Sequence, residues 1–124
     1  GMLRRLRGRG FRVGIVTRNC RAAVERVLDR HPMVFDALLT RDDVDYVKPD
    51  PRHLLAALDL LGVTGQQAVM CGDHPMDVLA GRRIGAKTVG VLPPGLTGER
   101  FAQAVPDLIL ERVTDLLSHL DAAR

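Results

Sequence analysis

Short apolar runs alternate with amphipathic stretches along the whole chain. Runs of strand length cover residues 13–16, 37–39, 68–71, 89–92 and 108–110. Between them, apolar residues recur at helical spacing in three groups: Val24, Val27 and Leu28; Leu54, Leu55, Leu58 and Leu61; Val113, Leu116, Leu117 and Leu120. Uniformly apolar strands separated by helices are typical of a parallel sheet covered on both faces. We therefore predict an α/β fold with a Rossmann-like parallel sheet and helices on both faces.

Local signals place the ends of two predicted helices. Asn19 is expected to cap the first long helix, and Asp50 followed by Pro51 is a strong signal for the start of the second. Gly62 is expected to end that second helix. The chain contains no internal repeat, low-complexity tract or flexible linker. Residues 1–124 are therefore predicted to form a single domain.

Composition excludes several classes of protein. Hydrophobic residues make up 46% of the 124 residues and charged residues 27%, with both signs interspersed, which argues against disorder. No apolar run approaches the roughly 20 residues that a membrane-spanning helix needs. Cys20 and Cys71 are too few for a disulfide framework, so we interpret both as free thiols. A cytoplasmic protein without membrane contact is expected.

The net charge of +3 is concentrated near the N-terminus, where seven arginines precede the first acidic residue, Glu25. One interpretation is a nucleic-acid-binding arm. The other, which we favour, is the solvated face of a short helix from Leu3 to Arg7 that ends at Gly8 and Gly10.

In parallel α/β sheets, ligands bind beyond the carboxyl ends of the strands. Thr17, Arg18 and Asn19 follow the first strand and offer a hydroxyl, a cation and backbone N–H groups, which suit a phosphate dianion. The alternative, which such a pattern taken alone favours, is a purely structural turn. Lys48 lies before Pro49 in a stiff loop, where its ammonium could stabilise charge on a phosphoryl group. A solvated loop lysine is the alternative.

The third strand leads into Gly72, Asp73, His74 and, four residues after Asp73, Asp77. Two carboxylates at the start of a helix could offer oxygen ligands of the kind that magnesium prefers. Alternatively, acidic residues are favoured in the first helical turn by the helix dipole. His74 is interpreted as a solvent-facing loop residue.

Three motifs in order resemble the haloacid dehalogenase-like hydrolase superfamily, in particular its phosphoglycolate-phosphatase-like members. They are Gly14-Ile15-Val16-Thr17, then Lys48-Pro49, then Gly72-Asp73 with Asp77 and Gly81. The resemblance implies that Thr17 and the backbone near Arg18 and Asn19 bind phosphate, and that Lys48 neutralises developing charge. It also implies that Asp73 holds Mg²⁺, with Asp77 supporting it, and that a phosphate monoester from a small phosphorylated metabolite is hydrolysed.

The family's first motif, a strand that ends in Asp-x-Asp, is not found upstream of Thr17. In the family its first Asp attacks phosphorus and its second acts as general acid and base. The chain has one Asp-x-Asp, Asp43-Val44-Asp45, in a polar stretch that is more typical of a solvated loop. We therefore expect no catalytic nucleophile, a missing first central strand, an inactive isolated chain and weak Mg²⁺ binding. No cap domain fits between Thr17 and Lys48.

Two alternatives to a phosphatase stay open. One is a non-catalytic protein that binds phosphate or a partner, and the other is a nucleic-acid-binding domain that uses the arginine patch. A missing central strand would leave unpaired backbone groups on its two neighbours. We therefore expect a homo-oligomer, a partner that donates a strand, or marginal stability.

Overall fold

The structure is a computed structural model that describes residues 2–122. The chain divides into two compact units, Gly1–Val63 and Thr64–Arg124. The first unit contains α1 (Met2–Gly8), β1 (Gly14–Val16), α2 (Arg21–Arg30), β2 (Ala37–Leu39), the 3₁₀ turn η1 (Arg41–Asp43) and α3 (Pro51–Leu61). The second contains η2 (Gly65–Gln67), β3 (Val69–Gly72), α4 (Pro75–Arg83), β4 (Lys87–Val91), η3 (Gly98–Phe101), β5 (Leu108–Leu110), η4 (Val113–Asp115) and α5 (Leu116–Ala122). Whether the two units form the single domain predicted for residues 1–124 depends on how they assemble, so a single domain stays a prediction.

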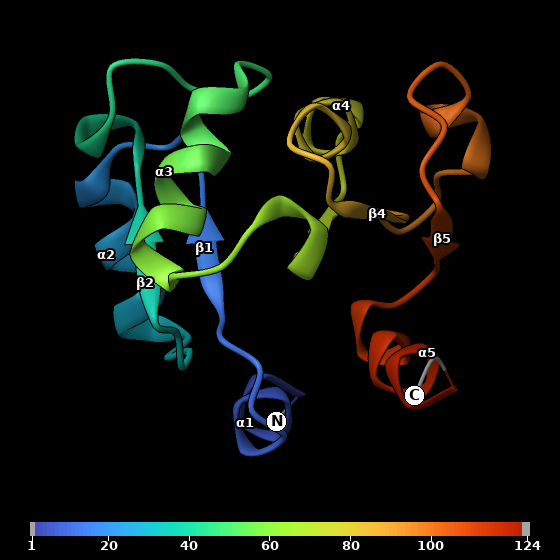
Figure 1. The fold of residues 1–124 in the computed structure, drawn as a ribbon, viewed down its shortest axis with the longest axis horizontal. Coiled ribbons are helices and arrows are strands. Elements are labelled where there is room, and N and C mark those ends of the chain that lie inside the picture. Colours follow the sequence, from blue (N-terminus) through green and yellow to red (C-terminus); the bar gives the residue numbers. More distant parts are fainter. Residues whose placement is uncertain (1, 123–124) are drawn as a thin grey trace. The chain divides into compact units, whose positions relative to one another are not determined.

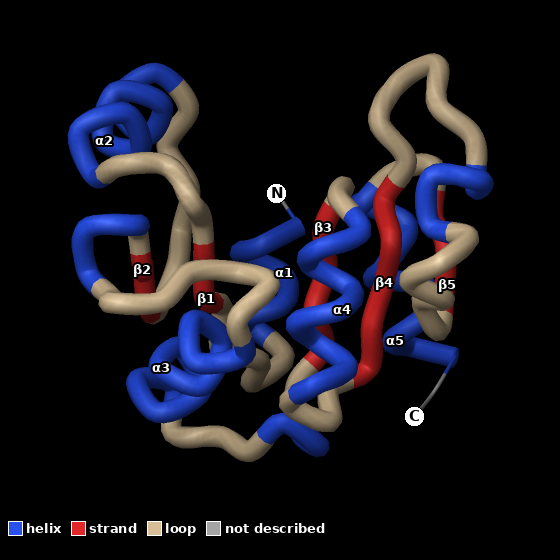
Figure 2. The backbone as a smooth tube through the Cα atoms, turned by 90° about the horizontal axis from the view of Figure 1, so that it is seen from above, coloured by secondary structure: helices blue, strands red, loops and turns tan. Residues whose placement is uncertain are grey.

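In the first unit, β1 and β2 pair in parallel, with Gly14 opposite Ala37 and Val16 opposite Leu39. Helices α2 and α3 lie on opposite sides of this pair (Figures 1 and 2). Val24 of α2 and Leu54 and Leu58 of α3 are buried, as their spacing predicts. Two members of the predicted stripes are exposed, Val27 to 55% and Leu55 to 48%, so the buried faces of both helices are narrower than predicted.

The predicted ends of α3 are confirmed. The Asp50 side chain accepts a hydrogen bond from the Arg52 N–H at 2.9 Å, Pro51 fills the first turn, and Gly62 has a φ of 69°. That left-handed conformation is one that glycine adopts without steric cost. The predicted cap of α2 is wrong, because Cys20 and not Asn19 precedes this helix. The Asn19 N–H instead donates to the Thr17 hydroxyl, which holds Asn19 in the preceding turn.

The second unit is a parallel sheet in the order β3-β4-β5. Helices α4 and α5 lie on opposite faces of this sheet (Figures 1 and 2). Its core consists of Val78, Phe101 and Ala104, none of them more than 1% exposed. Gly90 of β4 makes room for the ring, because a Cβ there would lie 2.8 Å from a carbon of Phe101.

An α/β fold with parallel strands and covering helices is thus confirmed, but the strands form two sheets. Between residues 2 and 122, β1 pairs only with β2, and β3 pairs only with β4 on one of its sides. The predicted strands match these elements to within two residues at either end. The last predicted helix is divided, because Val113 lies in η4 and is 38% exposed whereas Leu116 begins α5 and is buried. None of the helices in the described part of the chain combines the length and hydropathy needed to span a bilayer.

Candidate functional site

Lys48 lies in the loop between η1 and α3 and is only 7% exposed. Its ammonium donates a hydrogen bond to the Val16 carbonyl oxygen, with 2.9 Å between Nζ and oxygen. Val16 is the last residue of β1, so the only cation of this loop lies at the carboxyl end of the strand that precedes Thr17. The alternative of a solvated loop lysine is wrong.

The turn after β1 is tied to the strand beside it. The Thr17 N–H donates to the Leu39 carbonyl at 3.0 Å, and the Arg41 N–H donates to the Asn19 carbonyl at 3.0 Å. The Thr17 hydroxyl oxygen accepts from the Asn19 N–H at 3.1 Å. Arg18 is exposed beside this turn. The turn is therefore well defined, and phosphate binding by Thr17, Arg18 and Asn19 stays a prediction.

His53, in the first turn of α3, is completely buried and was missed by the sequence reasoning. Its Nδ1 accepts a hydrogen bond from the backbone N–H of Lys48 at 3.1 Å. Burial lowers the pKa of His53 below its ordinary value, and the nearby Lys48 ammonium lowers it further. The signal that could have indicated its burial is its position on the apolar face of α3, next to Leu54.

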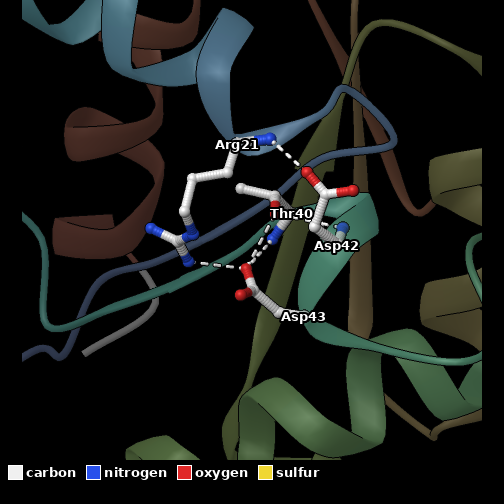
Figure 3. A network of polar contacts seen from close by, with 4 residues as sticks. All are labelled: Arg21, Thr40, Asp42 and Asp43. Carbon is white, nitrogen blue, oxygen red and sulfur yellow. Dashed lines mark hydrogen bonds and ion pairs between the residues drawn. The ribbon is translucent and has the colours of Figure 1, made fainter.

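A polar network connects α2 with η1 (Figure 3). The Asp43 Oδ2 accepts from the Thr40 N–H at 2.7 Å, from the Thr40 hydroxyl at 2.8 Å and from the Arg21 guanidinium at 2.6 Å. The Arg21 backbone N–H donates to Asp42 at 2.8 Å. The bond from the Thr40 backbone, then the Arg21 guanidinium and the Thr40 hydroxyl, lower the pKa of Asp43 to about 2.

These contacts give Asp43 a structural role. The predicted solvated loop is instead a 3₁₀ turn closed by a capping box. The Thr40 hydroxyl accepts a hydrogen bond from the Asp42 N–H, and the Asp43 carboxylate accepts one from the Thr40 N–H. A carboxylate held by three donors and with a lowered pKa is a poor nucleophile. The interpretation that Asp43-Val44-Asp45 does not replace the family's first motif is supported by this bonding.

In the second unit, Asp73 and Asp77 lie on one turn after β3. Asp73 is exposed, and Asp77 is 7% exposed. The Asp77 Oδ2 accepts from the His74 N–H at 3.3 Å, and the His74 Nδ1 accepts from the Met76 N–H at 3.1 Å. His74 is exposed, as predicted, but it is also the N-cap of α4, a role that the sequence reasoning missed.

Arg100, in η3, holds the loop that carries Asp73. Its Nε donates to the Asp73 carbonyl oxygen at 2.6 Å. The contact joins residues that are 27 positions apart, and no periodicity or motif in the sequence indicates it. Arg100 therefore fixes the backbone of Asp73 through its carbonyl oxygen, and the bond does not involve the carboxylate.

The three motifs occupy the turns after β1 and β3 and the loop before α3. Residues 1–91 match the sequence profile of the haloacid dehalogenase-like hydrolase family. The chain belongs to this family.

A pyrophosphatase, PpaX, from Bacillus cereus is 39% identical over 118 residues, which cover 93% of this chain and 54% of the relative. A hydrolase from Pseudomonas syringae of known crystal structure is 32% identical, with a TM-score of 0.87 over 98% of this chain and 56% of that one. A phosphatase of the family from Thermococcus onnurineus is 30% identical, with a TM-score of 0.79 over 96% of this chain and 54% of that one. The chain thus spans about half the length of the relatives it matches.

The described residues supply only part of the ligand set that a magnesium site of this family would need. No three His, Cys, Asp or Glu side chains converge on a metal position within the described part of the chain. Asp73 and Asp77 supply two carboxylates, and the Asp77 Oδ2 already accepts a backbone hydrogen bond. Mg²⁺ requires near-octahedral oxygen coordination, so these two residues alone do not make a complete site.

Arginines of the N-terminal patch make contacts within the first unit. The predicted helix of this patch is confirmed as α1, Met2–Gly8. The Arg7 guanidinium lies 3.1 Å from the Asp36 carboxylate, and the Arg12 guanidinium donates to the Leu61 carbonyl. These contacts give two of the arginines a structural role. The expectation that the patch does not serve nucleic-acid binding stays a prediction.

Proposed function

We propose that this chain forms the phosphate- and metal-handling part of a phosphatase-type hydrolase that acts on phosphate monoesters of small metabolites in the cytoplasm. The observation that carries the proposal is the buried Lys48 ammonium at the end of β1, 2.9 Å from the Val16 carbonyl. A cation at this point lies beside the turn that offers a hydroxyl and backbone N–H groups to a phosphate. There it could stabilise a phosphoryl group bound beside Thr17.

Each residue of the turn after β1 has a part in this proposal. The Thr17 oxygen accepts from the Asn19 N–H, which leaves the hydroxyl proton to donate to a phosphate oxygen. The Lys48 ammonium, which bonds the Val16 carbonyl, brings a positive charge to the end of β1. The exposed Arg18 adds positive charge next to the turn. Together these groups would bind and orient a phosphate dianion and stabilise negative charge that develops on it.

Asp73, with Asp77 in support, is proposed to contribute to a Mg²⁺ site that other parts of the intact protein complete. The ion would neutralise charge on the phosphoryl oxygens when bound. With two carboxylates, this chain by itself is expected to bind Mg²⁺ only in the millimolar range or more weakly. Asp73→Asn should weaken that binding further in calorimetry, and tight binding to the chain alone would contradict the proposal.

The isolated chain is proposed to be inactive, because the intact family pattern forms an aspartyl-phosphate on an Asp-x-Asp motif and the one such motif here is Asp43-Val44-Asp45. The same observation favours a second candidate, a non-catalytic protein that binds phosphate. The pyrophosphatase names of the relatives make inorganic pyrophosphate a substrate to test beside a monoester.

The test joins this chain to the N-terminal half of a relative that carries the Asp-x-Asp strand, and measures release of phosphate from an aryl phosphate and from pyrophosphate. We expect the isolated chain to show no turnover and the joined protein to show magnesium-dependent turnover that Lys48→Met abolishes. Lys87→Met is the matched control, because Lys87 is exposed and is the only other lysine. Phosphate binding without turnover in the joined protein would favour the non-catalytic candidate, and turnover by the isolated chain would refute the proposal.

A further inference from the structure

His53 is a buried polar residue that the proposed chemistry does not use. Its side chain has no exposed surface, although it sits only two residues after the helix start at Pro51. Its Nδ1 accepts the Lys48 N–H at 3.1 Å, so the ring proton is on Nε2. Within the described residues, Nε2 makes no hydrogen bond of normal geometry, although the Leu39 carbonyl lies near the ring. A buried donor without a partner costs stability, which an apolar residue at this position would avoid.

The compensating contact is with Lys48, which is held at both ends. His53 binds its backbone N–H, and the Val16 carbonyl binds its ammonium at 2.9 Å. A lysine stem is flexible, and its ammonium can be placed reproducibly only if the backbone that carries it is fixed. His53 fixes that backbone from the rigid first turn of α3.

We propose that His53 is a positioning residue for Lys48, which it holds through a neutral imidazole, and that protonation of the ring releases this hold. The proposal rests on the proposed function for its purpose, because a positioned Lys48 matters only if the ammonium binds an anion. The hold itself is a property of the folded chain.

Protonation would turn the acceptor into a donor. Both nitrogens of an imidazolium carry protons, so Nδ1–H would point at the Lys48 N–H. Burial of the ring opposes this change most, and the Lys48 ammonium opposes it too, whereas the Leu39 carbonyl group and the Asp43 carboxylate of η1 favour it. The opposing influences are larger, so the neutral form persists into mildly acidic solution. We expect the hold on Lys48 to be lost only below the ordinary pKa of histidine.

Two substitutions separate positioning from packing. In His53→Asn the side-chain oxygen can take the place of Nδ1 and accept the Lys48 N–H, but it cannot titrate. In His53→Leu the volume is similar and the acceptor is gone. A role in packing alone predicts that the smaller and more polar Asn is the more disruptive substitution, whereas positioning predicts that the loss of the acceptor in His53→Leu is.

The deciding measurement is the backbone amide of Lys48, followed by NMR through its proton shift and its hydrogen exchange between pH 8 and pH 4. The wild-type chain should show a protected amide at neutral pH and a shift with the titration of His53 in acid. His53→Asn should keep the protection without the pH step, and His53→Leu should lack both. An unchanged Lys48 amide in His53→Leu would overturn the proposal. If His53→Leu does not fold, the absence of a pH step in the wild-type chain would overturn it.

Titration with inorganic phosphate separates this proposal from the proposed function. At neutral pH, His53→Leu should weaken binding by about tenfold, as a misplaced binding group does, and His53→Asn should retain it. In a Lys48→Met background His53→Leu should have no further effect, because its effect acts through Lys48. A phosphate affinity that is unchanged in His53→Leu would overturn the link between positioning and anion binding. If the wild-type chain binds no phosphate, the proposed function fails for this chain, and the Lys48 amide still decides the role of His53.

Discussion

Gly72 is a position where one side-chain atom decides the geometry of a candidate ligand. A Cβ at Gly72 would lie 2.1 Å from the Asp77 Oδ2 and 2.4 Å from the Asp77 Cβ. Since both the tip and the base of Asp77 are affected, rotating the carboxylate away is not enough. The glycine therefore allows Asp77 to turn back and bond the His74 N–H.

Gly72→Ala should break this capping arrangement and destabilise the chain by about 1–3 kcal/mol, the usual cost of forcing extra volume into a packed site. Urea unfolding followed by circular dichroism measures the change. Gly8→Ala is the control, because a Cβ there meets no atom within 4 Å and the residue ends a helix. Equal effects of the two substitutions would contradict the argument.

His53 also gives stability a pH dependence whose sign follows from its lowered pKa. The unfolded chain binds a proton near pH 6.5, whereas the folded chain does so only at lower pH. This contribution to stability is therefore fully present above about pH 6.5 and is lost as the pH falls below that value. Urea unfolding at steps from pH 7.5 to pH 5 should show a decline that is smaller in His53→Asn. Identical slopes in the two proteins would contradict the lowered pKa.

At the scale of elements, Asp43 joins η1 to the start of α2 through Arg21 and makes this junction sensitive to acid. Its pKa of about 2 lies below the ordinary value of about 3.9 for an aspartate. The stabilisation that Asp43 provides is therefore present above about pH 4 and is lost as the pH falls toward about 2.

Asp43→Asn should lower stability at neutral pH and remove part of the decline between pH 4 and pH 2. The measurement is thermal unfolding across that range. Asp45→Asn is the matched control, since Asp45 is exposed two residues away on the same loop, and it should keep the wild-type profile. A wild-type pH profile in Asp43→Asn would show that the network in Figure 3 does not form in solution.

The elements that the sequence predicted well carry strong local signals. The bounds of β2 and β5 follow from their apolar runs, and those of α3 follow from Asp50, Pro51 and Gly62. The errors arise where a competing local hydrogen bond or the packing between elements decides. The Thr17 hydroxyl draws Asn19 out of the cap position, and exposure of Val27 depends on what α2 packs against.

The candidate site divides in the same way. Lys48, Asp73 and Asp77 could be found from motif spacing, because the chemistry fixes residue types after each strand. Arg100 and His53 could not, since one acts on a carbonyl 27 positions away and the other on a backbone N–H through its buried ring. Residues that hold a site in place rarely share its sequence motif.

At the scale of the whole molecule, both sheets have strands with an unpaired edge within residues 2–122, β1 and β2 in the first unit and β3 and β5 in the second. Unpaired strand edges present free N–H and C=O groups that another chain can bind. The Lys87 N–H donates to the Ala68 carbonyl, so in the alternating pattern of a strand the backbone groups of Val69 point away from β4. Val69 is also 39% exposed. The β3 edge is thus open to strand addition.

We therefore expect the chain to associate through these edges or to be only marginally stable. Sedimentation velocity should show an average mass that rises with concentration, and Val69→Pro should reduce the association. Proline removes the outward N–H of Val69 without removing a bond to β4, and Ala68 already has the extended backbone that must precede a proline. Met70→Pro is the contrasting control, because by the same alternation its N–H points toward β4, and it should unfold the second sheet. A wild-type chain that stays monomeric and unfolds with the stability of an ordinary domain, about 5 kcal/mol or more, would contradict this expectation, because its edges would then need no partner.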